Sequence, residues 1–484
     1  MIAADAALPD EAQVLIIGSG AGGATTAAVL AEAGLDVLVV EEGEWVEQGS
    51  VVPFSLEQMD RQYRAGGVTV ALGLPSIAYT EGRCAGGGTE INSGLYRRPP
   101  ADVLARWAAD YQIHDFAADE LFAIADEVER DLSVGLLPGA ATPASEILHR
   151  GADRLGWLND EIPRWMVYPD DGDATKGVRQ SMTRTYLPRA ERAGARILTG
   201  CRVDRLAVDA GRARHAHVRM RDGRRATIRF DDVFVCGGAI QTPAVLQRSG
   251  VRGHIGRSLA VHPTVKLAAR FAGHVNTPDD VPVHQVKEFA PDLSFGGSAS
   301  QPGLVALALS DHWSAFAPAM ADWERISVFY AAITSEGRGA VRSVRGLRDP
   351  IVTYRLTGRD REMLRSGLAR LALLMLEAGA EEIYPSFREA PIVRDRAGLA
   401  TMQDRFAAGR ASVMTVHLCS TVPLGEADGI TGADSYGRVH GTTNVWVNDA
   451  SLLPTAPGVN PQATVMAIAI RNARRFAATR STRG

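Results

Sequence analysis

The stretch that decides the fold is "GSGAGG", residues 18–23. It follows the apolar run "VLII" at 14–17, which is typical of a buried parallel strand. It precedes "ATTAAVLAEA" at 24–33, whose small and apolar residues suit a helix packed on that strand. In G-x-G-x-x-G the first glycine permits a tight turn, the second lets the backbone approach a pyrophosphate, and the third allows helix and strand to pack closely. The pattern is met by Gly18, Gly20 and Gly23.

An acidic residue follows at the spacing that such a site requires. A second apolar run, "VLVV" at 37–40, ends in Glu41, 18 residues after Gly23. A carboxylate near this position accepts the ribose hydroxyls of a dinucleotide, and it argues against a 2′-phosphate because two negative charges would meet. A glycine motif alone is a weak signal. Here strand, glycines, helix, second strand and acid arrive in order and predict a dinucleotide site in a doubly wound α/β domain. They do not separate NAD from FAD.

Length, charge and cysteine usage narrow the class of protein. A chain of 484 residues is long for a single core, so we expect two domains or one large compound domain. The net charge of −4 gives no reason to expect nucleic acid as a partner, and no apolar run is long enough to predict a membrane span. The four cysteines form no CxxC pair, so no metal site is expected. The N-terminus lacks a signal-peptide pattern, and we expect a cytoplasmic protein.

Two more glycine clusters lie further along the chain. The stretch "GRCAGGGTEINSGLYRR" at 82–98 would bring backbone amides to a ligand, and a flexible surface loop is the plain alternative. In "VFVCGGAIQTPAVLQRSG" at 233–250, an apolar strand runs into two glycines and then a helix. Thr242 is the expected N-cap of that helix and Pro243 its first residue. The candidate ligand-binding residues of the stretch 82–98, the second glycine cluster of the chain, are Gly86, Gly87, Gly88 and Asn92.

The C-terminal region is the most informative part of the sequence. It contains "HLCSTVPLG" at 417–425 and "YGRVHGTTNVWVNDASLLPTAPGVNPQAT" at 436–464. With these segments, the chain resembles the glucose–methanol–choline (GMC) family of FAD-dependent oxidoreductases. The segment 436–464 is most similar to the bacterial cholesterol oxidase branch. The matching blocks cover nearly the full length in family order, at 14–43, 82–98, 181–206, 233–263 and 417–475.

The resemblance implies roles in holding FAD. The first glycine motif and Glu41 would hold the ADP half, and residues 86–92 would line the flavin and the pyrophosphate. Val203 occupies the position at which family members contact adenine through a backbone group. Asp449 and Ala450 match the end of the family's flavin-binding strand.

The resemblance also implies two catalytic residues. His417 matches the family's catalytic histidine, and Asn460 matches a second active-site position that holds His or Asn. Alcohol oxidation needs a hydride acceptor, which a flavin supplies, and a base, for which a histidine with a pKa of about 6.5 is suited. Asn460 also stands where an N-cap is expected, with Pro461 as first helical residue, and the positive end of that helix would stabilise a reduced flavin. His440 and His262 are interpreted as structural.

The chain departs from the family pattern at points that matter. The usual H-x-x-G-T-x-x-M-G is here "HLCSTVPLG", with Ser420 in place of the first glycine, and we expect a slight shift of this loop. Members with covalently attached flavin carry a histidine in the second glycine block. "GGGTEINSG" has none, so we expect FAD to be bound non-covalently.

The sequence predicts a discontinuous FAD-binding domain of the Rossmann type and a second domain. We assign 1–265 to the first part of the FAD-binding domain, with 156–180 contributing to the substrate side, and 405–484 to its C-terminal part with the catalytic residues. Residues 266–404 lack glycine motifs and contain strand-like runs and a helical period at 361–378. They predict a substrate domain with an antiparallel sheet. Four polar residues there are expected to be structural or on the surface: His284, Glu288, Tyr330 and Arg338.

The leading hypothesis is FAD-dependent oxidation of the CH–OH group of a small alcohol to a carbonyl, with hydride transfer to flavin and His417 as the base. The substrate, the oligomeric state and the electron acceptor, O2 or another, stay open. The alternative is an FAD-containing lyase of the same fold, similar to hydroxynitrile lyases, without net redox. The C-terminal segments disfavour an NAD-linked dehydrogenase. Retention of His417 and Asn460 disfavours a non-catalytic flavoprotein.

Overall fold

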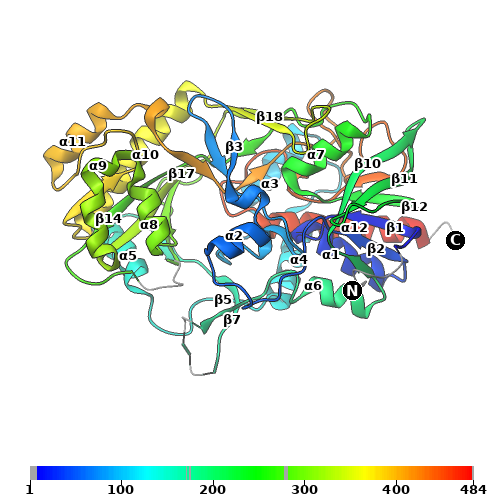
Figure 1. Cartoon of the computed structure of the whole chain (residues 1–484), viewed down its shortest axis with the longest axis horizontal. Helices are drawn as coiled ribbons and strands as arrows, with labels where there is room; N and C mark the ends of the chain where they lie inside the picture. The colour runs from blue at the N-terminus through cyan, green and yellow to red at the C-terminus, as the bar shows by residue number, and fades with distance from the viewer. Residues whose placement is uncertain (1–7, 171, 174–175, 277–281, 482–484) are drawn as a thin grey trace.

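The computed structural model describes residues 8–170, 172–173, 176–276 and 282–481. Two large sheets organise them. In Figure 1 the first sheet lies on the right, where N- and C-terminal segments run side by side, and the second lies on the left with helices around it.

The first sheet is built around buried parallel strands. Strand β1 (Glu11–Ile17) pairs in parallel with β2 on one side and β12 on the other, and β9 and β23 continue this parallel pairing outward. Both predicted apolar runs are fully inside the core, as expected for strands covered on both faces. Strands β10 and β11 extend the sheet beyond β12 in antiparallel fashion. The other strands are β2 (Val37–Val40), β9 (Arg196–Leu198), β10 (Cys201–Asp209), β11 (Arg212–Met220), β12 (Arg225–Val235) and β23 (Val445–Val447).

Helix α1 (Ala21–Glu32) follows β1 directly, which confirms the predicted strand–glycine–helix unit. Nine of its twelve residues are buried, because α6 and α12 pack against it. A helix that is small and apolar on all sides suits such a position. The other helices near the first sheet are α3 (Ala101–Asp110), α4 (Ala118–Asp131), α6 (Tyr186–Arg192), α7 (Gly238–Arg248) and α12 (Gln462–Ser481).

Helix α7 corrects one prediction. It begins at Gly238, so Thr242 is not its N-cap and Pro243 lies inside it. A proline within a helix leaves the carbonyl four residues earlier without its usual donor. Here that carbonyl, on Ala239, accepts a hydrogen bond of 2.8 Å from the Thr421 hydroxyl. The partner lies almost two hundred residues away in sequence, and a local pattern cannot show it.

The second sheet is mainly antiparallel, as predicted for the substrate side. Its order is β3-β4-β21-β14-β17-β16-β15-β6, with β20 also paired to β14. The predicted strand-like run at 325–334 and the helical period at 361–378 are present as β17 and α10, and α10 begins with a capping box formed by Thr357 and Asp360. The strands are β3 (Thr69–Ala71), β4 (Ile77–Tyr79), β6 (Asn159–Glu161), β14 (Thr264–Arg270), β15 (His284–Val286), β16 (Leu293–Ser298), β17 (Ile326–Ile333), β20 (Glu382–Pro385) and β21 (Val413–Thr415).

Segments far apart in sequence complete this second sheet. Strand β6, from the predicted contributor 156–180, pairs with β15. Strands at 69–79 and 413–415 also belong to it, although the predicted boundaries of 265 and 404 leave them outside the substrate domain. The remaining elements are β5 (Val134–Gly135), β7 (Arg164–Val167), β8 (Val178–Arg179), β13 (Ala260–Val261), β18 (Arg338–Arg342), β19 (Ile351–Arg355), β22 (Leu418–Cys419), α2 (Leu56–Gln62), α5 (Pro143–Leu155), α8 (Pro302–Leu309), α9 (Trp313–Phe316), α10 (Gly358–Glu377) and α11 (Arg396–Arg405).

Candidate functional site

Two glycine turns meet at the carboxyl end of β1. A Cβ added to Gly87, in the short 3-10 helix η2 (Gly87–Thr89), would lie 3.1 Å from the Cα of Gly20. The Gly86 N–H donates to the Ser19 hydroxyl at 3.1 Å. The structure therefore brings the two predicted glycine clusters into direct contact.

The three glycines of the first motif have different surroundings. A Cβ on Gly18 would lie 2.4 Å from the carbonyl of Cys236, and one on Gly23 would lie 2.1 Å from the carbonyl of Gly18. A Cβ on Gly20 would meet nothing within 4 Å, and the same holds for Gly88. No side chain caps the N-terminus of α1, so its first N–H groups are oriented to bind an anion. These residues fit the pyrophosphate of a dinucleotide.

Glu41 is buried at the end of β2 and is held by backbone groups. One carboxylate oxygen accepts from the N–H and the hydroxyl of Ser19, at 3.0 and 2.7 Å, and the other accepts from Gly43 N–H at 2.7 Å. Burial raises the pKa of Glu41, and these hydrogen bonds oppose the rise. Ser19 thus links the acid to both glycine turns.

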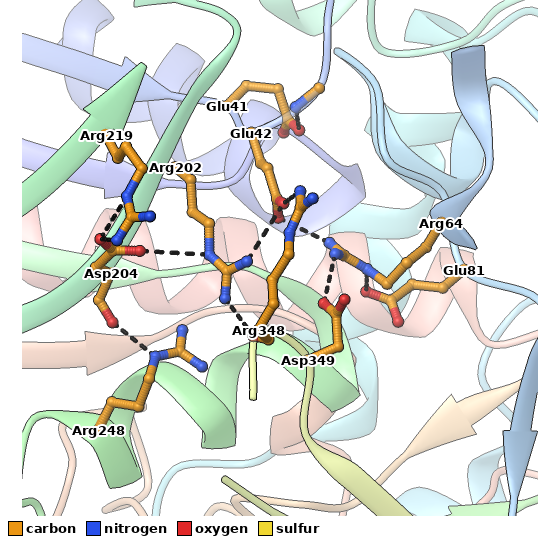
Figure 2. A network of polar contacts seen from close by, with 11 residues as sticks. Glu41, Glu42, Arg64, Glu81, Arg202, Asp204, Arg219, Arg248, Arg348 and Asp349 are labelled. Carbon is orange, nitrogen blue, oxygen red and sulfur yellow. Dashed lines mark hydrogen bonds and ion pairs between the residues drawn. The ribbon is translucent and has the colours of Figure 1, made fainter. Parts of the chain in front are cut away.

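The next residue, Glu42, points into a network of ion pairs. Figure 2 shows its carboxylate among guanidinium groups, apart from Glu41. Burial raises the pKa of Glu42, but the charge of Arg64 and hydrogen bonds from arginines outweigh this and lower it to about 2. The network joins the end of β2 to Asp349, in the loop before β19. The arginines nearest Glu42 are Arg64 (2.9 Å), Arg348 (2.7 Å) and Arg202 (3.8 Å).

Val203 and Asp449, the residues predicted to lie at the adenine and at the flavin, are both held by backbone contacts near the glycine turns. Strand β10, which carries the buried Val203, begins beside β2, because the Cys201 N–H donates to the Glu41 carbonyl at 2.8 Å. Asp449 is buried and accepts hydrogen bonds from Gly238 N–H at 2.8 Å and the Thr242 hydroxyl at 2.5 Å. Burial raises the pKa of Asp449. This residue fixes the start of α7 against the end of β23.

The segment with His417 is attached to the same strand end. The Ala450 carbonyl accepts from Ser420 N–H at 3.1 Å. Ser420 has a φ of 68°, in the left-handed region that favours glycine, which explains the glycine in the family pattern. Its hydroxyl donates to the Pro454 carbonyl at 2.6 Å and holds the serine in that strained conformation.

The start of α12 lies at the second glycine cluster. The Asn92 side chain donates to that of Gln462 at 2.8 Å. The helix begins at Gln462, so Pro461 is not its first residue and Asn460 stands two residues before it. The carbonyl of Pro461 accepts the first helical hydrogen bond, from Val465.

Two histidines, His262 and His417, contact each other beside the turn that precedes α12. Nδ1 of His417 lies 2.8 Å from Nδ1 of His262, and Nε2 of His262 accepts from the Gly458 N–H at 3.0 Å. Burial lowers the pKa of His417 to about 4, with a smaller effect from the charge of Lys287. Burial likewise lowers the pKa of His262. His417 is therefore neutral at pH 7 and beside the turn that carries Asn460.

Sequence reasoning missed two of these residues. The sequence predicts a structural role for His262, because a lone histidine before a proline has no motif that connects it to position 417. Ser19 is one of the variable positions of the glycine motif, so its link to Glu41 and Gly86 appears only in three dimensions. Among the described residues, no group of three or more His, Cys, Asp or Glu side chains is arranged to hold a metal ion, and all four cysteines are free and buried.

Comparisons with known proteins decide the family. The family models described as GMC oxidoreductase match residues 59–264 and 334–469, and an FAD binding domain model matches residues 11–50. An uncharacterised GMC-type oxidoreductase of Sinorhizobium fredii is 38% identical over 95% of this chain and 94% of its own length. The chain belongs to the GMC oxidoreductase family. It is an FAD-dependent oxidoreductase, as predicted.

Further relatives carry names of known activities. A long-chain-alcohol oxidase of Arabidopsis thaliana is 27% identical over 96% of this chain and 68% of its own length. Among solved structures, pyridoxine 4-oxidase from Mesorbium loti has a TM-score of 0.73 at 21% identity, over 96% of this chain and 99% of its own. The formate oxidase of Aspergillus oryzae has a TM-score of 0.74 at 16% identity, over 99% and 100%. They confirm the fold. Within the described residues, no helix has the length and apolar character to cross a bilayer.

Proposed function

We propose that this GMC oxidoreductase oxidises the CH–OH group of a small hydroxylated substrate to a carbonyl, with hydride transfer to non-covalently bound FAD and His417 as the base. The observation that supports this most is the position of His417. It is neutral at pH 7, partly buried, and beside the turn that carries Asn460. Its Nδ1 is in contact with His262, and no described residue forms a hydrogen bond with its Nε2.

The chemistry requires a proton and a hydride to leave the substrate. Bound FAD supplies the hydride acceptor. Nε2 of His417 would contact the substrate oxygen and take the hydroxyl proton, and Asn460 would orient that oxygen. The glycine turns, Glu41, Val203 and the Asp449–Ala450 strand end would hold the cofactor, in the roles that the family resemblance implies. The named activities of the alcohol and pyridoxine oxidases support a CH–OH substrate.

An anaerobic screen of alcohols tests the proposal. The flavin absorbance of the purified protein should bleach with a matching alcohol, and admission of O2 or an artificial acceptor should restore it. A carbonyl product formed from a cyanohydrin without bleaching would instead support the lyase alternative. Absence of bleaching across aliphatic, aromatic and sugar alcohols would contradict alcohol oxidation.

The mode of flavin attachment has a separate test. The second glycine block holds no histidine, so acid-denatured protein should release FAD into the supernatant. Flavin that precipitates with the chain would contradict non-covalent binding.

The cholesterol oxidase likeness of 436–464 and the cytoplasmic location stay predictions.

A further inference from the structure

The His262–His417 contact restricts where the hydrogens of the two rings lie. His262 is only 5% exposed, and both of its nitrogens are in polar contact. A 180° turn of its ring would put carbon atoms at both contacts, so only the observed ring orientation satisfies both of them. A neutral imidazole carries one hydrogen, and the other nitrogen accepts. Both rings are neutral at pH 7, because burial lowers the pKa of each.

The Gly458 N–H settles the direction of the chain of hydrogen bonds. A backbone N–H can only donate, so Nε2 of His262 is an acceptor and the hydrogen of His262 is on Nδ1. That hydrogen is donated to Nδ1 of His417, 2.8 Å away. Nδ1 of His417 is thereby the acceptor, and the single hydrogen of His417 lies on Nε2. If His417 donated to His262 instead, His262 would have to accept at both nitrogens, or its own hydrogen would lie on Nε2 and face the Gly458 N–H.

We propose that His262 is a positioning residue that holds His417 as the Nε2–H tautomer. Resting His417 then meets the substrate oxygen as a hydrogen-bond donor. This rests on the proposed function for the presence of a substrate oxygen at Nε2, and it refines that function. To take the hydroxyl proton at Nε2, His417 must first adopt the Nδ1–H form, in which His262 accepts and the Gly458 N–H loses its partner.

The same contact opposes protonation of His417. An imidazolium donates from both nitrogens, so His262 would again have to become the acceptor at Nδ1. The pair therefore holds His417 neutral as well as in one tautomer. His262 controls when His417 can act as a base, although it does not contact the substrate itself.

Nitrogen NMR of the flavin-loaded protein, with ¹⁵N-labelled histidine, tests this without substrate. The His417 signals are assigned by their loss in His417→Ala. In the unsubstituted protein Nε2 should carry the hydrogen and Nδ1 should not. In His262→Phe, which removes both polar contacts, the Nδ1–H form should appear.

Two further variants complete the design. In His262→Gln the amide can donate to His417 and accept from Gly458, so the Nε2–H form and the low pKa should be retained. His284→Phe is the matched control: His284 is also buried beside another histidine, His149, with ring centroids 5.0 Å apart. It should leave His417 unchanged.

Several results would overturn the proposal. They are an Nδ1–H tautomer in the unsubstituted protein, an unchanged tautomer in a flavin-loaded His262→Phe, or a His262→Gln that behaves like His262→Phe. If His262→Phe fails to fold, the tautomer of His417 in the unsubstituted protein and in His262→Gln still tests the proposal. Failure of the alcohol screen would contradict the proposed function and leave this tautomer measurement untouched.

Discussion

At the scale of single residues, the glycines of 18–23 have different roles: Gly20 leaves space for the cofactor, and Gly23 allows close packing of the backbone. Substitutions at the two positions should therefore have different effects. Gly20 has a φ of −67°, which any residue adopts, and its Cβ would meet no atom of the protein. Gly20→Val should therefore fold but bind no FAD, because the side chain would occupy the space of the pyrophosphate. Gly23→Val should instead unfold the domain, since its Cβ would lie 2.1 Å from the Gly18 carbonyl. Flavin content per chain and circular dichroism of both variants check this; full flavin content in Gly20→Val would contradict it.

His417 gives the second prediction at this scale. His417→Ala should retain FAD but slow its reduction by substrate by about a hundred-fold or more, the usual effect of a lost general base. In the unsubstituted enzyme the rate should be nearly level from pH 8 to 5. It should fall as the pH drops through about 4, where His417 becomes protonated and unable to accept a proton. Stopped-flow reduction across pH measures both effects. A near-normal rate in His417→Ala would remove it from the mechanism.

The residues that sequence could and could not predict differ in a physical way. Gly18, Gly20, Gly23 and Glu41 occupy fixed spacings within one strand–helix–strand unit, and local geometry imposes those spacings. His262 contacts His417 across 155 positions of sequence, so no spacing connects them. Chemistry that depends on long-range contacts needs the structure.

At the scale of elements, helix ends show the same contrast between local patterns, which the sequence shows, and long-range contacts, which it does not. Strands β1 and β2 and helix α1 follow from apolar runs and small residues, and the sequence predicts them. The starts of α7 and α12 were not, because asparagine, threonine and proline favour helix ends only in general. Helix α7 continues across Pro243, since Thr421 supplies a donor to Ala239 that a local pattern cannot include.

The turn before α12 carries the next prediction. Asn460 stands two residues before this buried helix, close to the His262–Gly458 contact. An ionised carboxylate in Asn460→Asp would add negative charge where reduction of the flavin also adds it. At a partly desolvated site this costs about 1–3 kcal/mol. The flavin reduction potential should therefore fall, and less so at low pH, where the aspartate is protonated. Redox titrations at two pH values measure this. An unchanged or raised potential at high pH would place Asn460 away from the flavin.

At the scale of the whole molecule, buried ion pairs join parts that are distant in sequence. Arg64 is nearly buried and contacts Glu42 at the end of β2, Glu81, and Asp349 before β19. No sequence motif connects these charges, because Arg64 and Asp349 are 285 residues apart. Because this network of ion pairs lies directly after Glu41, its integrity supports the shape of the predicted ribose site (Figure 2).

Removal of this arginine should be costly. Arg64→Met leaves the nearly buried Glu81 without its ion-pair partner and removes one of the three arginines around Glu42. Breaking a buried pair in this way destabilises a protein by about 3–5 kcal/mol. Arg98→Met is the control, because Arg98 also pairs with two acids, Asp126 and Glu129, but its side chain is 44% exposed. Exposed pairs contribute about 0–1 kcal/mol. Urea unfolding followed by fluorescence at pH 7 compares the two variants. Equal losses of unfolding free energy in the two variants would show that the Arg64 ion pairs contribute no more to stability than exposed pairs do.

The network also predicts how stability depends on acid. The pKa of Glu42 in the folded protein is about 2, below its ordinary value of 4.5. A lowered folded pKa stabilises the protein fully above the unfolded value, and that stabilisation is lost as the pH falls from about 5 toward 2. A shift of this size is worth about 3 kcal/mol at pH 7, of which about 1 kcal/mol is lost by pH 4. Glu42→Gln removes this titration, so the variant should be less stable at pH 7 and should lose less stability between pH 7 and pH 4. Urea titrations of both proteins at those two pH values give the comparison. An equal loss in both would mean that Glu42 is not held ionised by Arg64 and Arg348.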